Sequence, residues 1–315
     1  MPFMTFKTLI VAASLLFAAA AAHAEQTLDI SYQRSSTLWI LLKQNGQLEQ
    51  RLKPLGFTVN WHEFSTGLLS SLNAGSVDLH ADVADAFALF TQAADAPLTY
   101  YAQENSSPGA QAIIVQDPSP IHSIADLKGK TVAVSKGSGS NYLLIRALKK
   151  AGLTLADITP RYLEAPDGGA AFANGSVDAW VIWDPFLASQ QLDHHVRVIA
   201  DGKDGLADYN RFYLATTKFA KAHPDVLQVT FDTLRETGQW VKAHPKEAAD
   251  ILGPLWGNIA PATVERANSR RSYDIIPVKL ENLAEQQRIA DTYHAAKLIP
   301  KALKINDITV WTPKP

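Results

Sequence analysis

The chain contains no cysteine, and this absence removes several classes of protein at once. Without thiols there is no disulfide framework, thiolate metal site, cysteine nucleophile or lipid-modified cysteine anchor. Nucleotide-binding motifs are also missing, because the glycines after the first predicted strand do not form G-x-G-x-x-G and no G-x-x-x-x-G-K-[ST] occurs. We therefore expect neither a cofactor nor a metal ion.

A strong charge of either sign is also lacking. The sequence has 29 basic and 31 acidic residues, a formal net charge of −2, and its basic residues are scattered. This balance gives no electrostatic footprint for nucleic acid, and we expect no such partner. Candidate metal-binding and acid/base pairs have unfavourable spacing. His194 and His195 are adjacent rather than four residues apart, as two metal ligands on a helix would be. His62 and Glu63 point to opposite faces of a predicted strand, so they do not form an acid/base pair. The composition favours a binding protein over an enzyme.

A long apolar run occurs only at the N-terminus. Lys7 gives a basic start, residues 8–22 form an uncharged apolar run, and residues 22–24 (AHA) match a small-x-small cleavage site. The run is too short for a membrane span and has the three-part order of a secretory signal. We predict a signal peptide over residues 1–24, cleaved after Ala24, and export to a periplasm.

One short motif occurs twice, 100 residues apart: residues 73–78 (NAGSVD) return as residues 173–178 (ANGSVD). The surroundings repeat as well, in the order strand, small-residue turn, apolar helix, glycine break, strand. Alone, the motif would be an ordinary helix-to-strand turn with a left-handed glycine cap. The repeated flanks instead favour a duplicated unit, and hence two similar lobes that hold a small ligand between them.

Helices and short strands alternate through most of the chain, which predicts mostly parallel sheets covered by helices on both faces. In the first lobe we expect strands at 28–32, 58–63 and 77–81 and helices at 38–52 and 67–74. After residue 216 only helices are predicted.

The predicted α/β lobes are joined by a two-segment hinge. We assign residues 25–115 and 217–315 to lobe 1 and residues 116–216 to lobe 2. The breaker cluster 117–120 and the apolar segment 211–216 are the predicted crossings, and two such crossings permit closure around a ligand.

Both repeat units place a small-residue turn before their first helix, where free N–H groups and the helix dipole attract anions. The ordinary interpretation is a pair of Ser/Thr N-caps. Two turns that face one cleft favour anion binding instead. The candidate residues are Gln33, Arg34, Ser35, Ser36 and Thr37 in lobe 1, and Gly137, Ser138, Gly139, Ser140 and Asn141 in lobe 2.

Further candidates follow the third strand of each unit. In lobe 2 these are Trp183, as a pocket wall, and Asp184, as a hydrogen-bond acceptor or counter-charge. Trp180 points to the other face of its strand, so at most one of the two tryptophans lines the cleft. In lobe 1, Asp82 and Asp85 either cap the next helix or bind a positive group on a zwitterionic ligand.

At these residues the chain resembles the periplasmic aliphatic sulfonate-binding proteins of ABC importers, in the sulfonate, taurine and nitrate group. The passages that carry the likeness are residues 31–34, 125–129, 136–141, 175–180 and 184–186. The resemblance implies a type II periplasmic-binding-protein fold, no catalysis, and delivery of a small sulfonate to a permease driven by a partner ATPase. We expect a monomer.

The resemblance also carries sulfonate contacts over to Gln33, Ser35, Ser36, Thr37, Ser138, Gly139, Ser140 and Asn141, with Trp183 and Asp184 beside them. Residues 81–85 (ADVAD) depart from the Gly/Ser-rich helix start of the family, as does the loop 104–109. Three alternatives therefore stay open. They are a zwitterionic or cationic ligand held by Asp82, Asp85, Asp184 and Trp183, an exported enzyme on the same fold, and a sensor partner of a membrane receptor.

Overall fold

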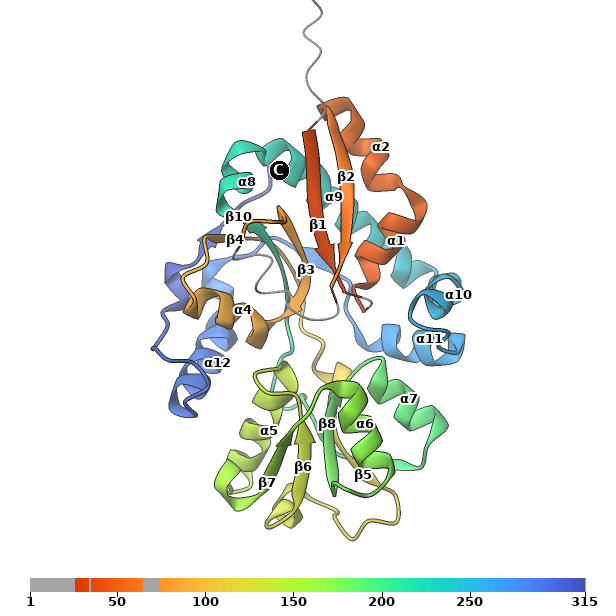
Figure 1. Cartoon of the computed structure of the whole chain (residues 1–315), viewed down its shortest axis with the longest axis vertical. Helices are drawn as coiled ribbons and strands as arrows, with labels where there is room; N and C mark the ends of the chain where they lie inside the picture. Colours follow the sequence, from red (N-terminus) through yellow and green to blue (C-terminus); the bar gives the residue numbers. More distant parts are fainter. Residues whose placement is uncertain (1–25, 34, 65–73, 315) are drawn as a thin grey trace, which may run out of the picture.

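The computed structural model describes residues 26–33, 35–64 and 74–314, and these form two α/β lobes stacked along the long axis (Figure 1). The upper lobe contains a seven-stranded sheet in the order β11-β4-β10-β3-β1-β2, with β12 paired to β4. The α/β class is confirmed. The strands of this sheet are β1 (Gln26–Tyr32), β2 (Phe57–Glu63), β3 (Leu79–Ala84), β4 (Leu98–Glu104), β10 (Arg211–Thr216), β11 (Ile275–Ile276) and β12 (Thr309–Val310).

Helices flank this sheet, most of them from the C-terminal part of the chain. The longest begins with a proline, whose missing N–H is not needed there, and buries an apolar face that includes Val226, Leu227 and Phe231. The helices are α1 (Thr37–Asn45), α2 (Gln47–Leu52), α4 (Asp85–Ala93), α8 (Thr217–Ala222), α9 (Pro224–Ala243), α10 (Pro245–Leu255), α11 (Pro261–Arg270) and α12 (Ala284–Ala295), with short 3-10 turns η1 (Lys53–Leu55), η5 (Leu280–Asn282) and η6 (Ile305–Asp307).

The lower lobe is built on a five-stranded sheet in the order β7-β6-β8-β5-β9. Its strands are β5 (Gln111–Gln116), β6 (Thr131–Val134), β7 (Thr159–Tyr162), β8 (Ala179–Trp183) and β9 (Val196–Asp201). Its helices are α5 (Gly139–Lys150), α6 (Ala165–Ala173) and α7 (Phe186–Asp193), with 3-10 turns η2 (Pro108–Ala110), η3 (Ile124–Leu127) and η4 (Leu155–Asp157).

The repeated motif has the same structural role in both lobes. β1 lies between parallel β2 and β3, as β6 lies between parallel β7 and β8. The Asp78 carboxylate accepts a hydrogen bond from Asp29 N at 3.1 Å, and the Asp178 carboxylate accepts one from Thr131 N at 2.8 Å. In each lobe the aspartate of the motif, which directly precedes the third strand, is thus bonded to the backbone of the first strand. The helix predicted over residues 67–74 lies outside the described residues except for its last position, as does the predicted signal peptide.

The predicted crossings are wrong. β5 pairs antiparallel with β8 and β9 in the lower sheet, whereas β10 pairs antiparallel with β3 and β4 in the upper sheet. The chain therefore passes between the lobes at residues 105–110 and 202–210. The physical reason is burial: apolar strand residues such as Ile114 and Phe212, at most 1% exposed, must lie inside a sheet. The polar segments beside them are left to bridge the lobes.

The two crossing segments are bonded to each other. Ser107 N donates to Asp208 O, and Gly202 N donates to Pro108 O, both at 3.0 Å. A Cβ atom at Gly202 would lie 2.3 Å from Ala207 O and 2.6 Å from Pro108 O, so only glycine permits this approach. The paired crossings form the junction about which the lobes are connected.

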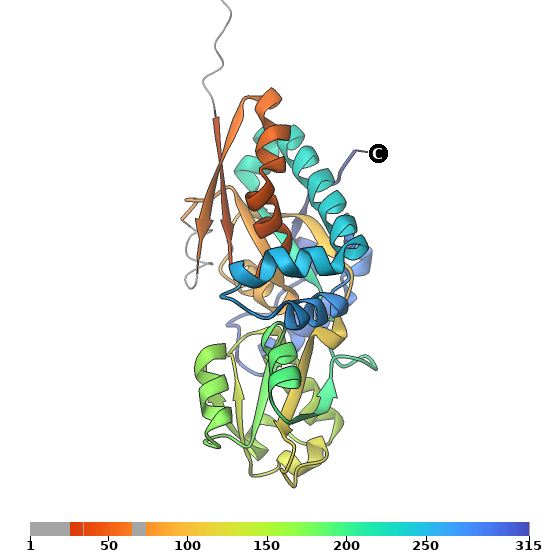
Figure 2. The same ribbon diagram turned by 90° about the vertical axis from the view of Figure 1, so that its right-hand side faces the viewer.

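Residues 217–315 are predicted to belong to the upper lobe alone, but two of the C-terminal helices also contact the lower lobe. α11 packs against α7, and α12 packs against α5, so both contact the lower lobe (Figures 1 and 2). The Tyr293 hydroxyl, on α12, donates to Ser138 O at 2.6 Å. Among the described residues, no helix has the length and apolar character needed to span a membrane.

Candidate functional site

A cavity of about 360 Å³ lies between the lobes. Seven predicted site residues line it, namely Gln33, Ser35, Asp82, Gly137, Ser138, Gly139 and Trp183. The remaining lining residues are Val83, Ala84, Phe87 and Phe90 from the upper lobe, Ser135, Lys136 and Glu164 from the lower lobe, and Tyr209 and Arg211 from the end of the second crossing and the start of β10. Both lobes and the junction thus contribute walls.

The N-terminus of α5 offers free hydrogen-bond donors at this cavity. Ser138 caps the helix: its hydroxyl oxygen accepts from Asn141 N at 3.2 Å, and the hydroxyl donates to Ser135 O at 2.7 Å. The N–H of Gly137 is taken by Asn141 Oδ1 at 3.0 Å. The N–H groups of Gly139 and Ser140 have no acceptor among the described residues. Together with the positive end of the helix dipole, they are suited to an anion.

Glycine at this turn allows two aromatic rings to approach the backbone. A Cβ atom on Gly137, whose φ is +72°, would lie 2.5 Å from the Phe90 ring, and one on Gly139 would lie 2.7 Å from the Tyr209 ring. Both rings come from outside the lower lobe. These glycines therefore permit close contact between the turn before α5 and side chains across the cleft.

Ser140 and Asn141 are buried and do not line the cavity. The Ser140 hydroxyl donates to Gln111 Oε1 at 3.5 Å, a weak contact, and the Asn141 carbonyl fixes the turn as described above. Their side chains support the α5 N-terminus from behind, and of their two N–H groups only that of Ser140 is left without an acceptor among the described residues.

The equivalent turn in the upper lobe is also split between lining and support. Gln33 and Ser35 line the cavity, whereas Ser36 and Thr37 are buried beneath it. The Ser36 hydroxyl accepts from Gln33 N at 3.1 Å, and Thr37 Oγ1 accepts from Tyr273 at 3.1 Å. Arg34 lies outside the described residues.

Asp82 lines the cavity and is bound by two arginines, and it is not the cap of α4 that the sequence suggests. Its carboxylate accepts from Arg211 Nε at 2.6 Å and from Arg271 Nη2 at 3.1 Å, and its side chain is only 2% exposed. Burial alone would raise the pKa of Asp82, but the Arg211 and Arg271 guanidiniums outweigh this and hold the pKa below its usual value. Asp82 is an ionised partner of two arginines, and it does not cap α4.

Arg211 is a cavity residue that sequence analysis missed. It is the first residue of β10, which runs antiparallel to β3 and so begins where β3 ends, at the cleft. Its Nε donates to Asp82, and its guanidinium lies over the Tyr209 ring, 5.8 Å from the ring centre. The signal for Arg211 is its position at the start of an apolar strand. It is hidden when residues 211–216 are interpreted as a crossing rather than as a strand of the sheet.

Asp85 and Asp184 do not line the cavity. Asp85 is buried, and its carboxylate accepts from Ala86 N at 2.8 Å and from Asn210 N at 2.9 Å; burial raises its pKa to about 7. Asp184 accepts two bonds from Arg270 Nη1, at 2.9 and 3.0 Å, and one from Ala188 N at 3.0 Å. The carboxylates predicted to hold a positive ligand group, Asp82 included, are thus engaged within the protein.

Aromatic side chains supply the apolar part of the cavity wall. Trp183 lines the cavity beside Phe87, Phe90 and Tyr209. Trp180 is 2% exposed and packs against Phe172, on the other face of the strand, as its position predicts. Four aromatic rings next to free N–H donors and an arginine suit a small anion with an apolar tail.

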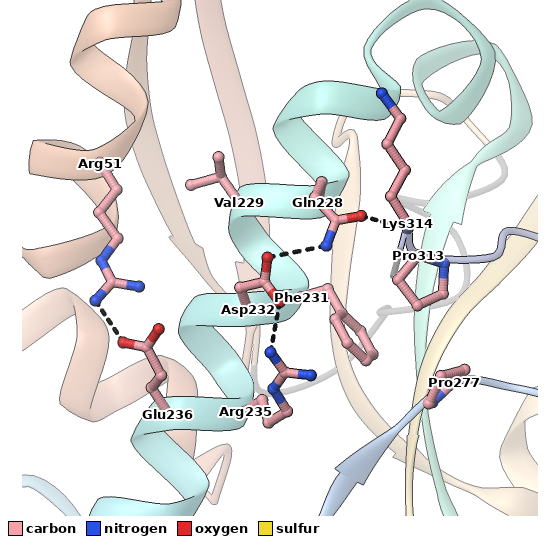
Figure 3. A pocket seen from close by; sticks show the side chains of 10 residues that line it. All are labelled: Arg51, Gln228, Val229, Phe231, Asp232, Arg235, Glu236, Pro277, Pro313 and Lys314. Carbon is pink, nitrogen blue, oxygen red and sulfur yellow. Dashed lines mark hydrogen bonds and ion pairs between the residues drawn. The ribbon is translucent and has the colours of Figure 1, made fainter.

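A larger hollow of about 790 Å³ lies on the outer face of the upper lobe, between α2, α9 and the C-terminal residues (Figure 3). Four of its charged side chains are paired with each other: Arg51 with Glu236 at 2.5 Å and Arg235 with Asp232 at 2.9 Å. The interlobe cavity is therefore the better candidate for ligand binding. Within the described ranges, no group of His, Asp and Glu side chains is arranged to hold a metal ion.

Known proteins with the same arrangement share much of this sequence. Residues 66–248 match the family described as NMT1/THI5 like. A protein of Escherichia coli K12 that is named as an aliphatic sulfonates-binding protein is 38% identical, over 94% of this chain and 92% of its own length.

Two solved structures are also similar. The crystal structure of the periplasmic aliphatic sulphonate binding protein SsuA from Escherichia coli has a TM-score of 0.85 and 37% identity, over 92% of this chain and 93% of that one. The alkanesulfonate-binding protein SsuA from Xanthomonas axonopodis pv. citri, solved bound to MOPS, has a TM-score of 0.82 and 36% identity, over 90% of this chain and 98% of that one. These matches confirm the predicted fold, and the chain belongs to the family of periplasmic aliphatic sulfonate-binding proteins.

Proposed function

We propose that the protein captures a small sulfonate in the interlobe cavity and delivers it to the permease of an ABC importer in the periplasm. One observation carries this proposal. The free N–H of Gly139, at the start of α5, and the guanidinium of Arg211 line the same cavity from opposite lobes. Donors on both sides suit a group with several equivalent oxygens, such as a sulfonate.

The polar and the aromatic parts of the cavity wall bind different ends of the ligand. The oxyanion binds to the α5 N-terminus and Arg211, with the Ser35 hydroxyl and the Gln33 amide as additional donors. The alkyl tail packs against the aromatic rings of Phe87, Phe90, Trp183 and Tyr209. The Xanthomonas relative bound to MOPS supports a ligand of this class.

Export and closure complete the proposed role. The relatives are periplasmic, in keeping with a signal peptide over residues 1–24 that is cleaved after Ala24. The two lobes, joined at residues 105–110 and 202–210, rotate about these segments to enclose the ligand as a monomer. Such a clamp presents a closed, loaded form to the permease and its ATPase.

Binding is tested by isothermal titration of the exported chain with a series of alkanesulfonates. Arg211→Gln should weaken binding ten- to a hundredfold, about 1.5–3 kcal/mol, because a charge-assisted hydrogen bond to the oxyanion is lost. Arg235→Gln, in the outer hollow of Figure 3, is the matched control and should bind as the wild type does. Failure of every sulfonate to bind the wild-type protein, or equal affinity in both variants, would contradict the proposal.

One further observation favours a ligand that also carries an amine. Glu164 lines the cavity, is exposed, and has no hydrogen bond or ion pair from its side chain among the described residues. Taurine and propane-1-sulfonate have nearly the same shape, but only taurine bears an ammonium group. Glu164→Gln should weaken taurine alone, by about two- to fivefold as for an exposed ion pair. An equal change for both ligands would rule out an amine subsite.

A further inference from the structure

Two adjacent arginines at the end of α11 bind carboxylates of different lobes. Arg270 donates from Nη1 to both oxygens of Asp184, at 2.9 and 3.0 Å, and from Nη2 to Gln191 on α7. Asp184 follows β8 of the lower sheet directly after Trp183, which lines the cavity. The Arg270 side chain is 16% exposed and that of Asp184 is 5% exposed. This ion pair therefore joins the upper lobe to the lower lobe in a largely desolvated place.

Arg271 anchors the same helix end to the upper lobe. It donates to Asp82 Oδ2 at 3.1 Å and to Glu104 Oε2 at 3.3 Å, and its guanidinium lies 4.6 Å from the centre of the Tyr273 ring. Because Arg271 is held by upper-lobe strands, its neighbour Arg270 is carried by that lobe. The Arg270–Asp184 ion pair is therefore a direct link between the two lobes.

Asp184 depends on this partner. Its burial raises the pKa of the carboxyl to about 6, and the charge and hydrogen bonds of Arg270 act in the opposite direction. A carboxylate buried in this way without its arginine is strongly unfavourable, and solvation by opening of the interface relieves it. The second anchor, Gln191, also accepts from Arg266 Nε at 3.3 Å, so the α11–α7 contact is polar throughout this cluster.

We propose that Arg270 is a positioning residue that holds the closed cleft, by fixing Asp184 and the adjacent Trp183 against the upper lobe. The inference rests on the proposed clamp function for its effect on ligand binding. The ion pair does not touch the ligand; it sets how long the closed form persists. Loss of the pair should therefore accelerate ligand release more than it slows capture.

The first measurement needs no ligand. Small-angle scattering of the ligand-free protein should show a larger radius of gyration in Arg270→Gln than in the wild type, because the lobes separate. The control is Arg51→Gln, which removes an arginine–carboxylate pair lying wholly within the upper lobe (Figure 3). It should leave the scattering profile unchanged. Identical profiles for Arg270→Gln and the wild type would overturn the proposal.

The second measurement is stopped-flow release of propane-1-sulfonate. Arg270→Gln should dissociate on the order of tenfold faster, with an association rate close to that of the wild type. Asp184→Asn should also accelerate release, and the double variant Arg270→Gln/Asp184→Asn should release the ligand no faster than Arg270→Gln alone. Additive effects of the two substitutions, or unchanged release rates, would refute the proposal that this ion pair holds the cleft closed. If the wild type binds no sulfonate, the proposed function fails, while the scattering experiment still decides the fate of the Arg270 inference.

Discussion

Asp85 makes the stability of the upper lobe depend on pH, in the direction opposite to that of an ordinary paired carboxylate. It is 1% exposed, and burial raises its pKa to about 7, with Glu285 and Asp208 adding repulsion against the bonds from Ala86 N and Asn210 N. In the unfolded chain the pKa returns to its ordinary value of 3.8. Between these values the folded state holds a proton that the unfolded state has lost. The free energy of unfolding therefore falls as pH rises through this window.

The magnitude follows from the two pKa values. A rise from 3.8 to about 7, at 1.36 kcal/mol for each tenfold change in the protonation constant, corresponds to about 4 kcal/mol at most. Asp85→Asn removes the ionisation but keeps one acceptor oxygen, so one of the two backbone hydrogen bonds is lost, about 1–2 kcal/mol. The variant should thus be less stable than the wild type near pH 5, and equally or more stable near pH 8.

The assay is urea unfolding of the wild type and of Asp85→Asn at several pH values from 4.5 to 8.5. The difference between the two proteins isolates Asp85, because every other titrating group is common to both. Its sign should reverse, or at least its size should change by several kcal/mol, across this range. A difference that is constant with pH would show that Asp85 does not titrate there, and would refute the reasoning.

Three further variants test other parts of the structure. Gly139→Ala should weaken sulfonate binding in titration calorimetry, because its Cβ would lie 2.7 Å from the Tyr209 ring; unchanged affinity would show that the ring yields freely. Gly202→Ala should lower the melting temperature, because its Cβ would lie 2.3 Å from a backbone oxygen at the junction; a wild-type melting temperature would contradict this. Asp178→Ala should lower the free energy of unfolding by about 0.5–1.5 kcal/mol, because the exposed hydrogen bond from the Thr131 N–H is lost, and chemical denaturation showing no loss would disprove this role for the motif.

The duplicated unit could be predicted from the sequence because each of its parts is local. A left-handed glycine, a buried valine and a strand-entry aspartate lie next to each other in residues 73–78 and 173–178, and each has a fixed structural requirement. The small-residue turn at the start of α5 was recognised for the same reason. The two-residue period of a strand predicts that Trp180 and Trp183 lie on opposite faces, and the structure has Trp183 at the cleft and Trp180 in the core.

The crossings could not be predicted from local sequence, because the residues of a strand do not indicate which other strands it pairs with. β5 and β10 are apolar runs like any other, and each joins its sheet by pairing with strands distant in sequence. An apolar run next to a breaker cluster predicts a connection when only its own residues are considered. Burial of the run inside a sheet, with the polar residues beside it as the bridge, is the better rule.

The charged residues around the cleft show why their roles are hard to predict. Asp82 lies 129 positions from Arg211 and 189 from Arg271, so its partners are far away in the sequence. Taken alone, a carboxylate near an anion site would repel the ligand. The sequence therefore leaves two roles for Asp82, a helix cap or a site for an amine group of the ligand. With two arginines on it, the same carboxylate instead orients Arg211 at the cavity. A buried acidic residue at an anion site is thus better evidence for an undetected arginine than for a cationic ligand.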